Sequence, residues 1–235
     1  MELPNVTFVV IDRVAHELTK MAIEDSLNLC NPADLLIFTD KPDKIKIQGA
    51  CYILTDPGDM ESYNKILYAQ VPKMVHTSHF LTIEWDGWIV NPGAWSDKFL
   101  EFDYIGAPWP FHKSGNRVGN GGFSLRSARL TKFLMENSKE FPPIHAEDHW
   151  LCREYGSALM AKGFKWADED TAQRFSFENG KPHPEGSFGF HDCRNWRHIL
   201  SEDKVQERLK LENDYLKSKL TWIYTKQGHR LTHLE

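Results

Sequence analysis

Two carboxylates and a glycine interrupt an apolar stretch in the first half of the chain. Residues 79–91 read HFLTIEWDGWIVN, so Glu84, Asp86 and Gly87 separate two apolar runs. Carboxylates two positions apart on an extended chain face the same side and can reach one ligand. An unpaired carboxylate at a buried sheet edge is costly, and such oxygen donors suit Mg²⁺ or Mn²⁺. The spacing indicates a divalent cation site; acids bonded to nearby backbone or arginine are the alternative.

A glycine-rich stretch follows later in the chain. Residues 118–126 read VGNGGFSLR, with Gly121 and Gly122 directly before a predicted strand. Glycine tolerates positive φ and lets the backbone approach a ligand closely. The stretch lacks the lysine and serine order of a P-loop, so it does not predict a nucleoside-triphosphate cradle. A ligand-facing loop and a tight turn of small residues both remain open.

Two further groups offer acid–base or ligand chemistry. The run HAEDH at 145–149 puts Glu147 and Asp148 at the start of a predicted helix. Acids there either stabilise the helix dipole or supply a general base to a hydroxyl. His191 precedes Asp192 in a predicted short extended segment. A histidine near a carboxylate is a candidate ligand, and a structural role is its alternative.

The elements that must position these groups alternate between strand and helix over residues 6–90. Strands are predicted at Val6–Asp12 and Asp34–Asp40, an edge strand at Ile45–Leu54, an interrupted strand at Phe80–Val90, and helices at Ala15–Leu29 and Asp59–Val75. This alternation is typical of a parallel α/β sheet. Ligands of such sheets bind beyond the carboxyl ends of the strands, where Asp12, Asp40 and Asp86 fall.

The second half of the chain has a less regular pattern. Short helices or extended segments are predicted at Pro92–Leu100, Tyr104–Trp109, Ser127–Asn137, Ala146–Met160 and Phe188–His191. The last predicted element is an amphipathic helix over Ser201–Lys219. We therefore expect one domain over residues 1–200 and a helical tail over 201–235. The tail is expected to pack back on the domain; dimerisation and peripheral membrane contact are its alternatives.

Size and composition exclude several classes of protein. The 235 residues are 41% hydrophobic and 26% charged, as in a globular protein with a sizeable core. The net charge of −5 gives no general attraction to nucleic acid. The four cysteines form no C-x-x-C pair, which argues against a zinc site or a disulfide framework. The amino-terminal residues lack a signal-peptide pattern, so we expect a cytoplasmic protein.

Several motifs in order resemble the GT-A nucleotide-sugar glycosyltransferases. They are EWDGWIVNPGAW, YIGAPWPF, VGNGGFSLRS, HAEDHWLCREYG, RFSFE and FGFH, and the resemblance covers roughly residues 5–198. The motifs look most like a bacterial glycosyltransferase-like family of surface-polysaccharide loci, whose members are mostly uncharacterised. The resemblance implies a single GT-A (Rossmann-like) domain with a mostly parallel central sheet flanked by helices.

The resemblance also implies roles for individual residues. Asp86 would hold a divalent metal, Mn²⁺ or Mg²⁺, on the donor diphosphate, with Glu84 as its partner and His191 completing the site. Glu84 departs from the glutamine usual in that family. Asp148, in the pair Glu147-Asp148, would be the general base of an inverting enzyme. Contacts to the donor are implied for Asp12, Asp40, Lys65, Gly121 and Gly122. Trp85 joins them because four tryptophans (Trp85, Trp88, Trp95 and Trp109) cluster there, and sugars pack on aromatic faces; an aromatic core is the other interpretation.

The implied function is transfer of a sugar from a UDP-sugar to a hydroxyl of a glycan, or a lipid-linked glycan, in surface-polysaccharide synthesis. The location would be cytoplasmic, with the inner face of the membrane as a peripheral site. A sugar nucleotidyltransferase is one alternative, but residues 6–13 lack the glycine-rich basic loop that usually marks such enzymes. A non-catalytic carbohydrate-binding module is another, and it would leave Asp86, Asp148 and His191 without a role.

Overall fold

Six strands form the central sheet of the protein. The computed structural model describes residues 1–56, 60–112, 117–143, 147–211, 216–217 and 219–220. The strand order is β3 (Cys51–Leu54), β2 (Asn31–Thr39), β1 (Glu2–Asp12), β4 (His79–Thr82), β6 (Leu125–Ser127) and β5 (Tyr104–Ile105). β1 pairs in parallel with β2 and β4, β2 pairs in parallel with β3, and β6 is antiparallel to both of its neighbours. The predicted mostly parallel sheet is therefore confirmed.

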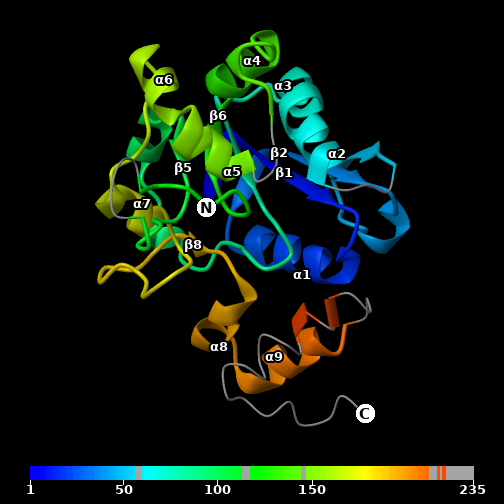
Figure 1. The fold of residues 1–235 in the computed structure, drawn as a ribbon. Helices are drawn as coiled ribbons and strands as arrows, with labels where there is room; N and C mark the ends of the chain where they lie inside the picture. Colours follow the sequence, from blue (N-terminus) through cyan, green and yellow to red (C-terminus); the bar gives the residue numbers. More distant parts are fainter. Residues whose placement is uncertain (57–59, 113–116, 144–146, 212–215, 218, 221–235) are drawn as a thin grey trace.

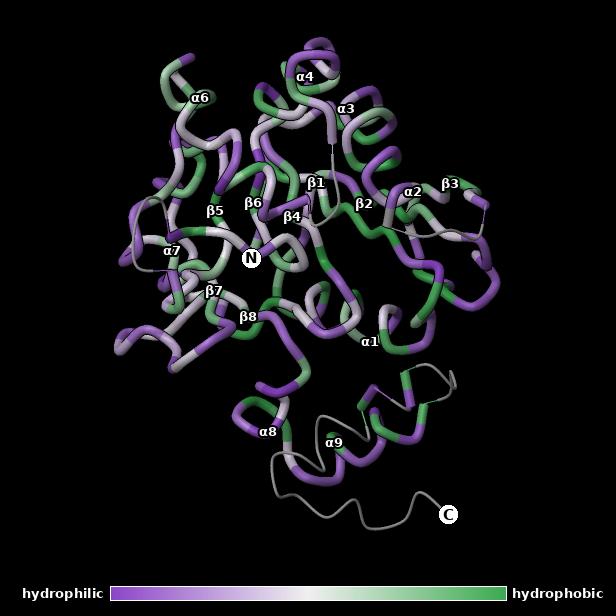
Figure 2. Tube along the Cα trace, viewed as in Figure 1, coloured by the Kyte–Doolittle hydropathy of each residue, from purple (hydrophilic) through white to green (hydrophobic). Residues whose placement is uncertain are grey.

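The two longest strands are buried on both faces. Successive side chains Phe8, Val9 and Val10 of β1 are each at most 1% exposed, and Ile37 and Phe38 of β2 are fully buried. Because successive side chains point to opposite faces of a strand, both sheet faces must be covered. Figure 1 shows α1 (His16–Leu27) on one side of these strands, with α2 (Met60–Lys65) and α3 (Val71–Met74) on the other. Figure 2 shows the hydrophobic colours concentrated inside, with hydrophilic stretches on the outer turns.

The helices predicted at Asp59–Val75 and Ala146–Met160 are present, and each contains a π-helical turn in its middle. α2 and α3 are joined by a π-helical turn at Ile66–Gln70. α5 (Glu147–His149) and α6 (Gly156–Ala161) are joined by another at Trp150–Glu154. The predicted starts at residues 59 and 146 lie outside the described residues. Such single-turn bulges often occur beside functional sites, and the second one directly follows Asp148.

The interrupted strand is where the sequence prediction is wrong in detail. β4 ends at Thr82, and the second apolar run, Trp88–Val90, does not continue in the main sheet. The Gly87 N–H donates to the Glu84 carbonyl at 3.2 Å, which turns the chain. Ile89 then forms an isolated antiparallel bridge to Gly189. The acidic pair therefore lies in the turn between β4 of the main sheet and the segment that pairs with Gly189.

Three other predicted elements are shorter than expected. The edge strand begins only at Cys51, after a 3₁₀ turn at Pro42–Lys44. Pro92–Leu100 consists of two 3₁₀ turns, Pro92–Ala94 and Asp97–Glu101, because the side chains of Asn91 and Ser96 each cap a new start. The strand predicted in Tyr104–Trp109 is limited to β5, residues 104–105.

The remaining elements surround the reversed strand β6. α4 (Ala128–Glu136) begins at the N-cap Ser127, whose hydroxyl accepts the Leu130 N–H. α7 (Glu169–Phe175) leads into β7 (Ser176–Phe177), which pairs in parallel with β8 (Gly189–Phe190) in a second small sheet. A 3₁₀ turn (Cys193–Asn195) and α8 (Trp196–Ile199) follow.

The C-terminal segment packs on the domain rather than extending from it. α9 (Glu202–Leu209) ends where the Lys210 and Leu211 N–H groups bond three residues back, to Glu207 and Arg208. The continuous helix predicted over Ser201–Lys219 is thus wrong, although residues 216, 217, 219 and 220 are again helical. Four apolar side chains of the segment are at most 3% exposed: Val205, Leu209, Leu216 and Leu220. Among the described residues, no helix is long and apolar enough to cross a membrane.

Candidate functional site

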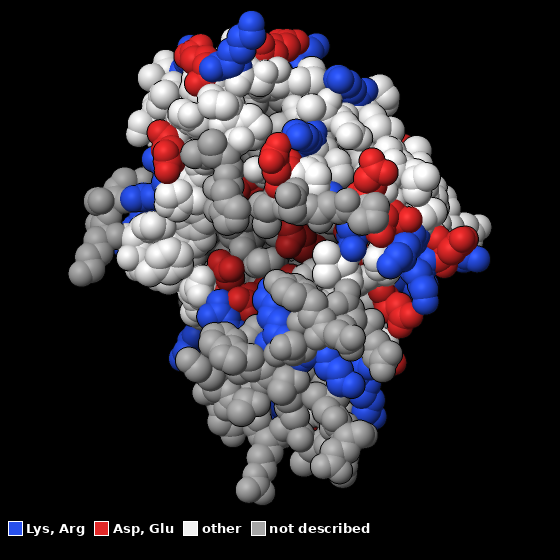
Figure 3. Space-filling model, turned by 45° about the vertical axis from the view of Figure 1, so that its right-hand side comes forward, with Lys and Arg blue, Asp and Glu red and all other residues white. Residues whose placement is uncertain are grey.

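Glu84, Asp86 and His191 bring one ligand atom each to a common point. These three atoms all lie within 4.8 Å of one another. The Nε2 atom of His191 lies 3.3 Å from Asp86 Oδ1 and 3.8 Å from Glu84 Oε2. The acidic pair and the late histidine, far apart in the chain, are thus brought together. Figure 3 shows acidic groups in a hollow of one face of the molecule, with basic groups beside them.

Backbone contacts hold the three ligands in place. The Glu84 N–H donates to the Gly122 carbonyl at 3.1 Å, and the His191 N–H donates to the Phe177 carbonyl at 3.0 Å. A Cβ atom on Gly122 would come within 2.1 Å of His191 Nε2, and one on Gly87 within 2.7 Å of a backbone oxygen. Only glycine therefore fits at these two positions without moving the site.

The donor atoms fit a divalent cation. Asp86 Oδ1 and His191 Nε2 are both buried, and neither has a hydrogen-bond partner. Buried polar atoms without partners are rare, and an ion is one recognised reason for them. A set of two carboxylates and one imidazole suits Mn²⁺ better than Mg²⁺, because Mg²⁺ prefers oxygen ligands alone.

The other ring nitrogen of His191 has polar partners. Nδ1 lies 2.8 Å from Asn120 Nδ2 and 3.3 Å from Glu178 Oε1. Burial lowers the pKa of His191, but the nearby carboxylates, Asp86 foremost, outweigh it and raise the pKa well above its ordinary value. The site therefore favours positive charge at this ring. Metal-binding histidines commonly use such a second carboxylate to fix the ring.

Asp148 lies close to the glycine-rich loop. Its Oδ2 atom accepts the Gly121 N–H at 3.1 Å, and Oδ1 accepts the N–H of His149 at 2.8 Å. Burial, followed by the charge of Glu147, raises the pKa of Asp148 to about 6. A carboxyl with this pKa gains a proton more readily than an ordinary aspartate and still ionises near neutral pH.

Glu147 has a different environment. Both of its oxygens accept from the guanidinium of Arg126, at 2.9 and 2.7 Å, and the Tyr68 hydroxyl donates to it at 2.9 Å. Arg126 is fully buried. A Cβ on Gly121 would come within 2.0 Å of Glu147 Oε1. The carboxylate is thus fully engaged in a buried ion pair that supports the glycine-rich loop.

The predicted donor-contacting residues at the sheet edge are spread over a wider area. Asp12 accepts the N–H groups of Val14 and Ala15 and so closes the turn before α1. Asp40 Oδ1 lies 2.8 Å from His16 Nε2. Lys65 is exposed and pairs with Glu61 at 2.9 Å on α2. None of these hydrogen-bond and ion-pair partners belongs to the triad.

A cavity of about 230 Å³ opens beside Asp12 and Asp40. Its lining is rich in basic side chains, and its other wall comes from the C-terminal segment: Arg13, Val14, Ala15, His16, Glu17, Leu18, Lys41, Lys44, Leu211 and Leu216. The chain as a whole has a net charge of −5. This local excess of positive charge therefore suits an anionic ligand.

The clustered tryptophans divide into two groups. Trp85 packs edge-on against Trp196, at a ring distance of 6.0 Å, and Trp88 is 2% exposed in the core. Trp95 also packs inward, against Phe99 and Phe188. For Trp88 and Trp95, the alternative of an aromatic core is the better description.

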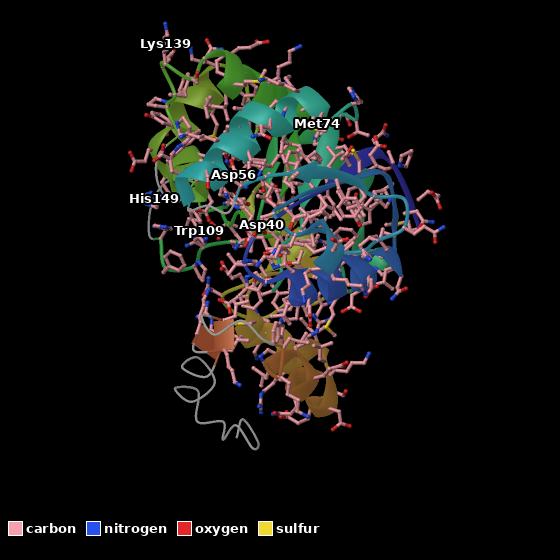
Figure 4. The ribbon with its side chains drawn as sticks, turned by 90° about the vertical axis from the view of Figure 1, so that its right-hand side faces the viewer. Asp40, Asp56, Met74, Trp109, Lys139 and His149 are labelled. Atoms are coloured by element: carbon pink, nitrogen blue, oxygen red, sulfur yellow. The ribbon has the colours of Figure 1, made fainter. Side chains whose placement is uncertain are left out.

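Trp109 is itself only 6% exposed, but it supports an exposed aromatic patch formed by Phe111, His112 and His149. Its ring lies 6.1 Å from Phe111 and 5.3 Å from His112, and His112 lies 6.3 Å from His149. Figure 4 shows Trp109 and His149 at the same edge of the molecule. Phe111 is 60% exposed. Because His149 follows Asp148, the patch is continuous with the half-buried carboxyl.

Three residues of the site had no role in the sequence analysis. The Tyr63 hydroxyl donates to Glu84 Oε1 at 3.1 Å, and Asn120 and Glu178 lie against His191. Asn120 and Glu178 lie in motifs considered above and Tyr63 lies in a predicted helix, but no spacing rule joins residues this far apart in the chain. Only the fold makes them neighbours.

Comparison with solved structures supports the fold. The chain is similar to a glycosyltransferase involved in the glycosylation of the major capsid of PBCV-1, with a TM-score of 0.50 at 14% identity, covering 86% of this chain and 97% of that one. It is also similar to the apo-form glycosyltransferase GlyE of Streptococcus pneumoniae TIGR4, with a TM-score of 0.48 at 13% identity, covering 85% and 55%. The first likeness confirms the predicted GT-A-like fold.

Sequence comparison gives one match. No curated protein matches the chain. A family model described as "Protein of unknown function (DUF5672)" matches residues 55–191, more than half of the chain and all three triad residues. The chain therefore belongs to this family.

Proposed function

We propose that this protein is a glycosyltransferase that moves a sugar from a nucleotide diphosphate donor, a UDP-sugar, to a hydroxyl of a glycan. The observation that carries the proposal is the pair of buried atoms without hydrogen-bond partners, Asp86 Oδ1 and His191 Nε2, within the triad. The pair lies beyond the end of a parallel strand, where α/β sheets bind ligands. The shared GT-A-like fold supports the same class of enzyme.

The triad would hold the cation, Mn²⁺ in preference to Mg²⁺. A bound cation supplies positive charge for the leaving diphosphate. Glu178 and Asn120 keep the His191 ring in one orientation through Nδ1, and Tyr63 does the same for Glu84. The protein's part is thus to fix three ligand atoms before the donor arrives.

Asp148 is the general base in this proposal. It takes the proton of the acceptor hydroxyl while that oxygen bonds to the anomeric carbon and the bond from this carbon to the phosphate oxygen breaks. The hydrogen bond from Gly121 N–H holds the carboxylate in place. A base that activates the acceptor for direct displacement gives inversion at the anomeric carbon.

Glu147 has a supporting role here and is not the base. Both of its oxygens accept from the buried Arg126 guanidinium, which stabilises the ionised carboxylate and makes Glu147 a weak base. Its charge raises the pKa of the neighbouring Asp148. The sequence resemblance favours Asp148 of the two acids, and these contacts support the same choice.

The nucleotide would lie along the edge formed by Asp12 and Asp40. The basic cavity next to these residues suits the charge of a nucleotide. Lys65, Trp85, Gly121 and Gly122 remain candidates for contacts with the donor. The two glycines let the loop pack directly against Glu147 and His191, where side chains would collide.

The acceptor would bind on the exposed aromatic patch. A sugar ring presents an apolar C–H face, and exposed aromatic rings bury such a face well. The patch ends at His149, next to the proposed base. A growing glycan, free or lipid-linked, is the expected acceptor, and the setting in surface-polysaccharide synthesis on the cytoplasmic side rests on the sequence resemblance alone.

Turnover with a panel of nucleotide sugars tests the proposal. Purified protein with Mn²⁺ should release nucleoside diphosphate from one donor, and release should rise when the right acceptor is added. Formation of a nucleotide sugar from a sugar phosphate and a nucleoside triphosphate would instead identify a nucleotidyltransferase. Glycan binding with no nucleotide binding would identify a carbohydrate-binding module.

A further inference from the structure

The C-terminal segment, residues 202–220 as far as they are described, lies outside the matched family region of residues 55–191. It nevertheless packs against the turn that carries Glu84 and Asp86, through contacts with Trp85 and Trp88. Val205, Leu209, Leu216 and Leu220 are buried, so the segment is held by its apolar face. Figure 1 shows α9 beneath α1, beside α8.

Arg208 fixes this segment to the domain. Its guanidinium carbon lies 4.2 Å from the ring centre of Trp88 and 5.7 Å from that of Trp196, and its terminal nitrogen donates to Asp25 on α1. Trp88 follows Asp86 by two positions, and Trp196 packs edge-on against Trp85. The anchor of the segment is therefore the same aromatic group that borders Glu84 and Asp86.

The segment also forms one wall of the basic cavity. Leu211 and Leu216 face Arg13, His16 and the start of α1 across this space. Without these two leucines, the cavity would be open on that side. The segment is thus part of the edge where the nucleotide would bind.

Lys219 follows Leu216 by three positions in a helical stretch, so both residues lie on one side of it. The Nζ atom of Lys219 lies 5.4 Å from the ring centre of Trp85. Trp85 stands between Glu84 and Asp86 in the sequence. This contact places the ammonium group beside the turn that carries Glu84 and Asp86.

Charge balance indicates what this cation could bind. Three carboxylates, those of Glu84, Asp86 and Glu178, lie around His191. A divalent ion offsets much of their charge, but a diphosphate adds more negative charge than the ion can balance. A second cation at the rim would meet that need, and a lysine binds phosphate as a point charge.

We propose that the C-terminal segment completes the donor site and that Lys219 pairs with the diphosphate of the nucleotide sugar. This inference rests on the proposed function, because it assumes a nucleotide diphosphate ligand. It makes the segment a part of the catalytic domain and assigns a donor-binding residue outside the family match.

Calorimetric titration with UDP and with uridine tests this proposal. The proteins are the unaltered full chain, Lys219→Ala, Lys219→Arg and the matched control Lys210→Ala, all with Mn²⁺. Lys210 is exposed in the same segment, just after α9. We expect Lys219→Ala to weaken UDP binding by about tenfold or more, the loss typical of a charge-assisted contact. Lys219→Arg should keep most of the affinity, Lys210→Ala should change nothing, and uridine binding should not respond to any variant.

The outcomes separate the two proposals. Equal UDP affinity of Lys219→Ala and the unaltered chain would overturn the role of Lys219 while leaving the proposed function intact. Failure of the unaltered chain to bind UDP or other nucleoside diphosphates would overturn the proposed function itself. Equal losses of UDP and uridine affinity in Lys219→Ala would show a structural effect and contradict the phosphate contact.

Discussion

The Nε2 atom of His191 and the Oδ1 atom of Asp86 lie 3.3 Å apart, and both are buried without a hydrogen-bond partner. Asp86 lies in the turn after β4, and His191 directly follows β8 in the second small sheet. They form an ion pair without a hydrogen bond, and buried polar atoms that lack hydrogen bonds are rare. In the proposed function, a divalent cation would bind between them and satisfy both atoms.

Added Mn²⁺ should stabilise the folded protein, because it binds the native site and not the unfolded chain. At a concentration 100 times the dissociation constant, the gain is about 2.7 kcal/mol, which corresponds to a rise in Tm of roughly 5–10 °C. His191→Gln should lose this rise, and His76→Gln, on an exposed histidine, should keep it. Differential scanning fluorimetry with and without EDTA measures the effect. A rise of the same size in His191→Gln would exclude the triad as the binding site.

Asp148→Asn should reduce turnover by about 10²–10⁴-fold, the usual contribution of a general base. UDP affinity should stay within about twofold, because the residue contacts the acceptor side. Asp203→Asn, on an exposed aspartate at the start of α9, is the matched control. Steady-state kinetics and calorimetry together provide the test. Parallel losses of turnover and UDP affinity would point to a donor-binding role instead.

The pH dependence of kcat/KM should have an acidic limb near pH 6. The pKa of Asp148 is raised to about 6 by burial and by Glu147, and a base works only when ionised. Activity should therefore fall as the pH drops through 6, where an ordinary aspartate would still be active. Initial rates between pH 4.5 and 8 at saturating Mn²⁺ measure the limb. A rate that stays constant down to pH 5 would contradict Asp148 as the base.

The same raised pKa has a consequence for stability. The folded state holds the Asp148 proton more tightly than the unfolded chain, so this carboxyl contributes less stability as the pH rises from about 4 to about 6. Asp148→Asn removes that pH-dependent cost. The variant should therefore be at least as stable as the unaltered protein at pH 7, as measured by urea unfolding. A clear loss of stability would mean that the Gly121 hydrogen bond outweighs the cost of the buried charge.

The buried pair Arg126–Glu147 should show strong coupling. Arg126→Met leaves the Glu147 carboxylate buried without its partner, which typically destabilises a protein by about 3–5 kcal/mol. Replacing both residues, as Arg126→Met with Glu147→Leu, should recover much of this loss. Urea unfolding of the single and double variants forms the cycle. Additive losses would show that the two residues act independently.

Phe111→Ala should weaken acceptor binding and leave donor binding unchanged. Phe111 is 60% exposed in the aromatic patch, so its removal has little effect on the core. We expect the acceptor KM to rise by about fivefold or more, since aromatic contacts contribute on the order of 1 kcal/mol. Met160→Ala, an exposed apolar side chain on α6, is the control. An unchanged acceptor KM in Phe111→Ala would remove the patch from the site.

Much of the fold follows from local sequence patterns. The apolar runs of β1 and β2 predict buried strands, and their alternation with α1 predicts the parallel sheet. The turn at Gly87 could not be predicted, because two apolar runs near each other are consistent with one strand. Its cause is tertiary: the Phe190 backbone packs against Gly87, with no room for a side chain.

The candidate site, too, was partly predictable from residue types and partly determined by tertiary contacts. Residue types and order suggested Asp86 and His191 as partners, and the fold brings them together. The resemblance favours Asp148 over Glu147 as the base, but the physical reason was not readable, because it depends on Arg126, which enters from β6 and is fully buried. Glu178 and Tyr63 likewise depend on contacts between distant segments.

Electron paramagnetic resonance of free Mn²⁺ tests the central claim most directly. The unaltered protein should remove about one Mn²⁺ per chain from the free signal, and UDP should tighten this binding, because the triad and the diphosphate share the ion. A variant that combines Asp86→Asn with His191→Gln should leave the signal unchanged at the same concentrations, with and without UDP. Equal Mn²⁺ binding by this variant and the unaltered protein would contradict the account.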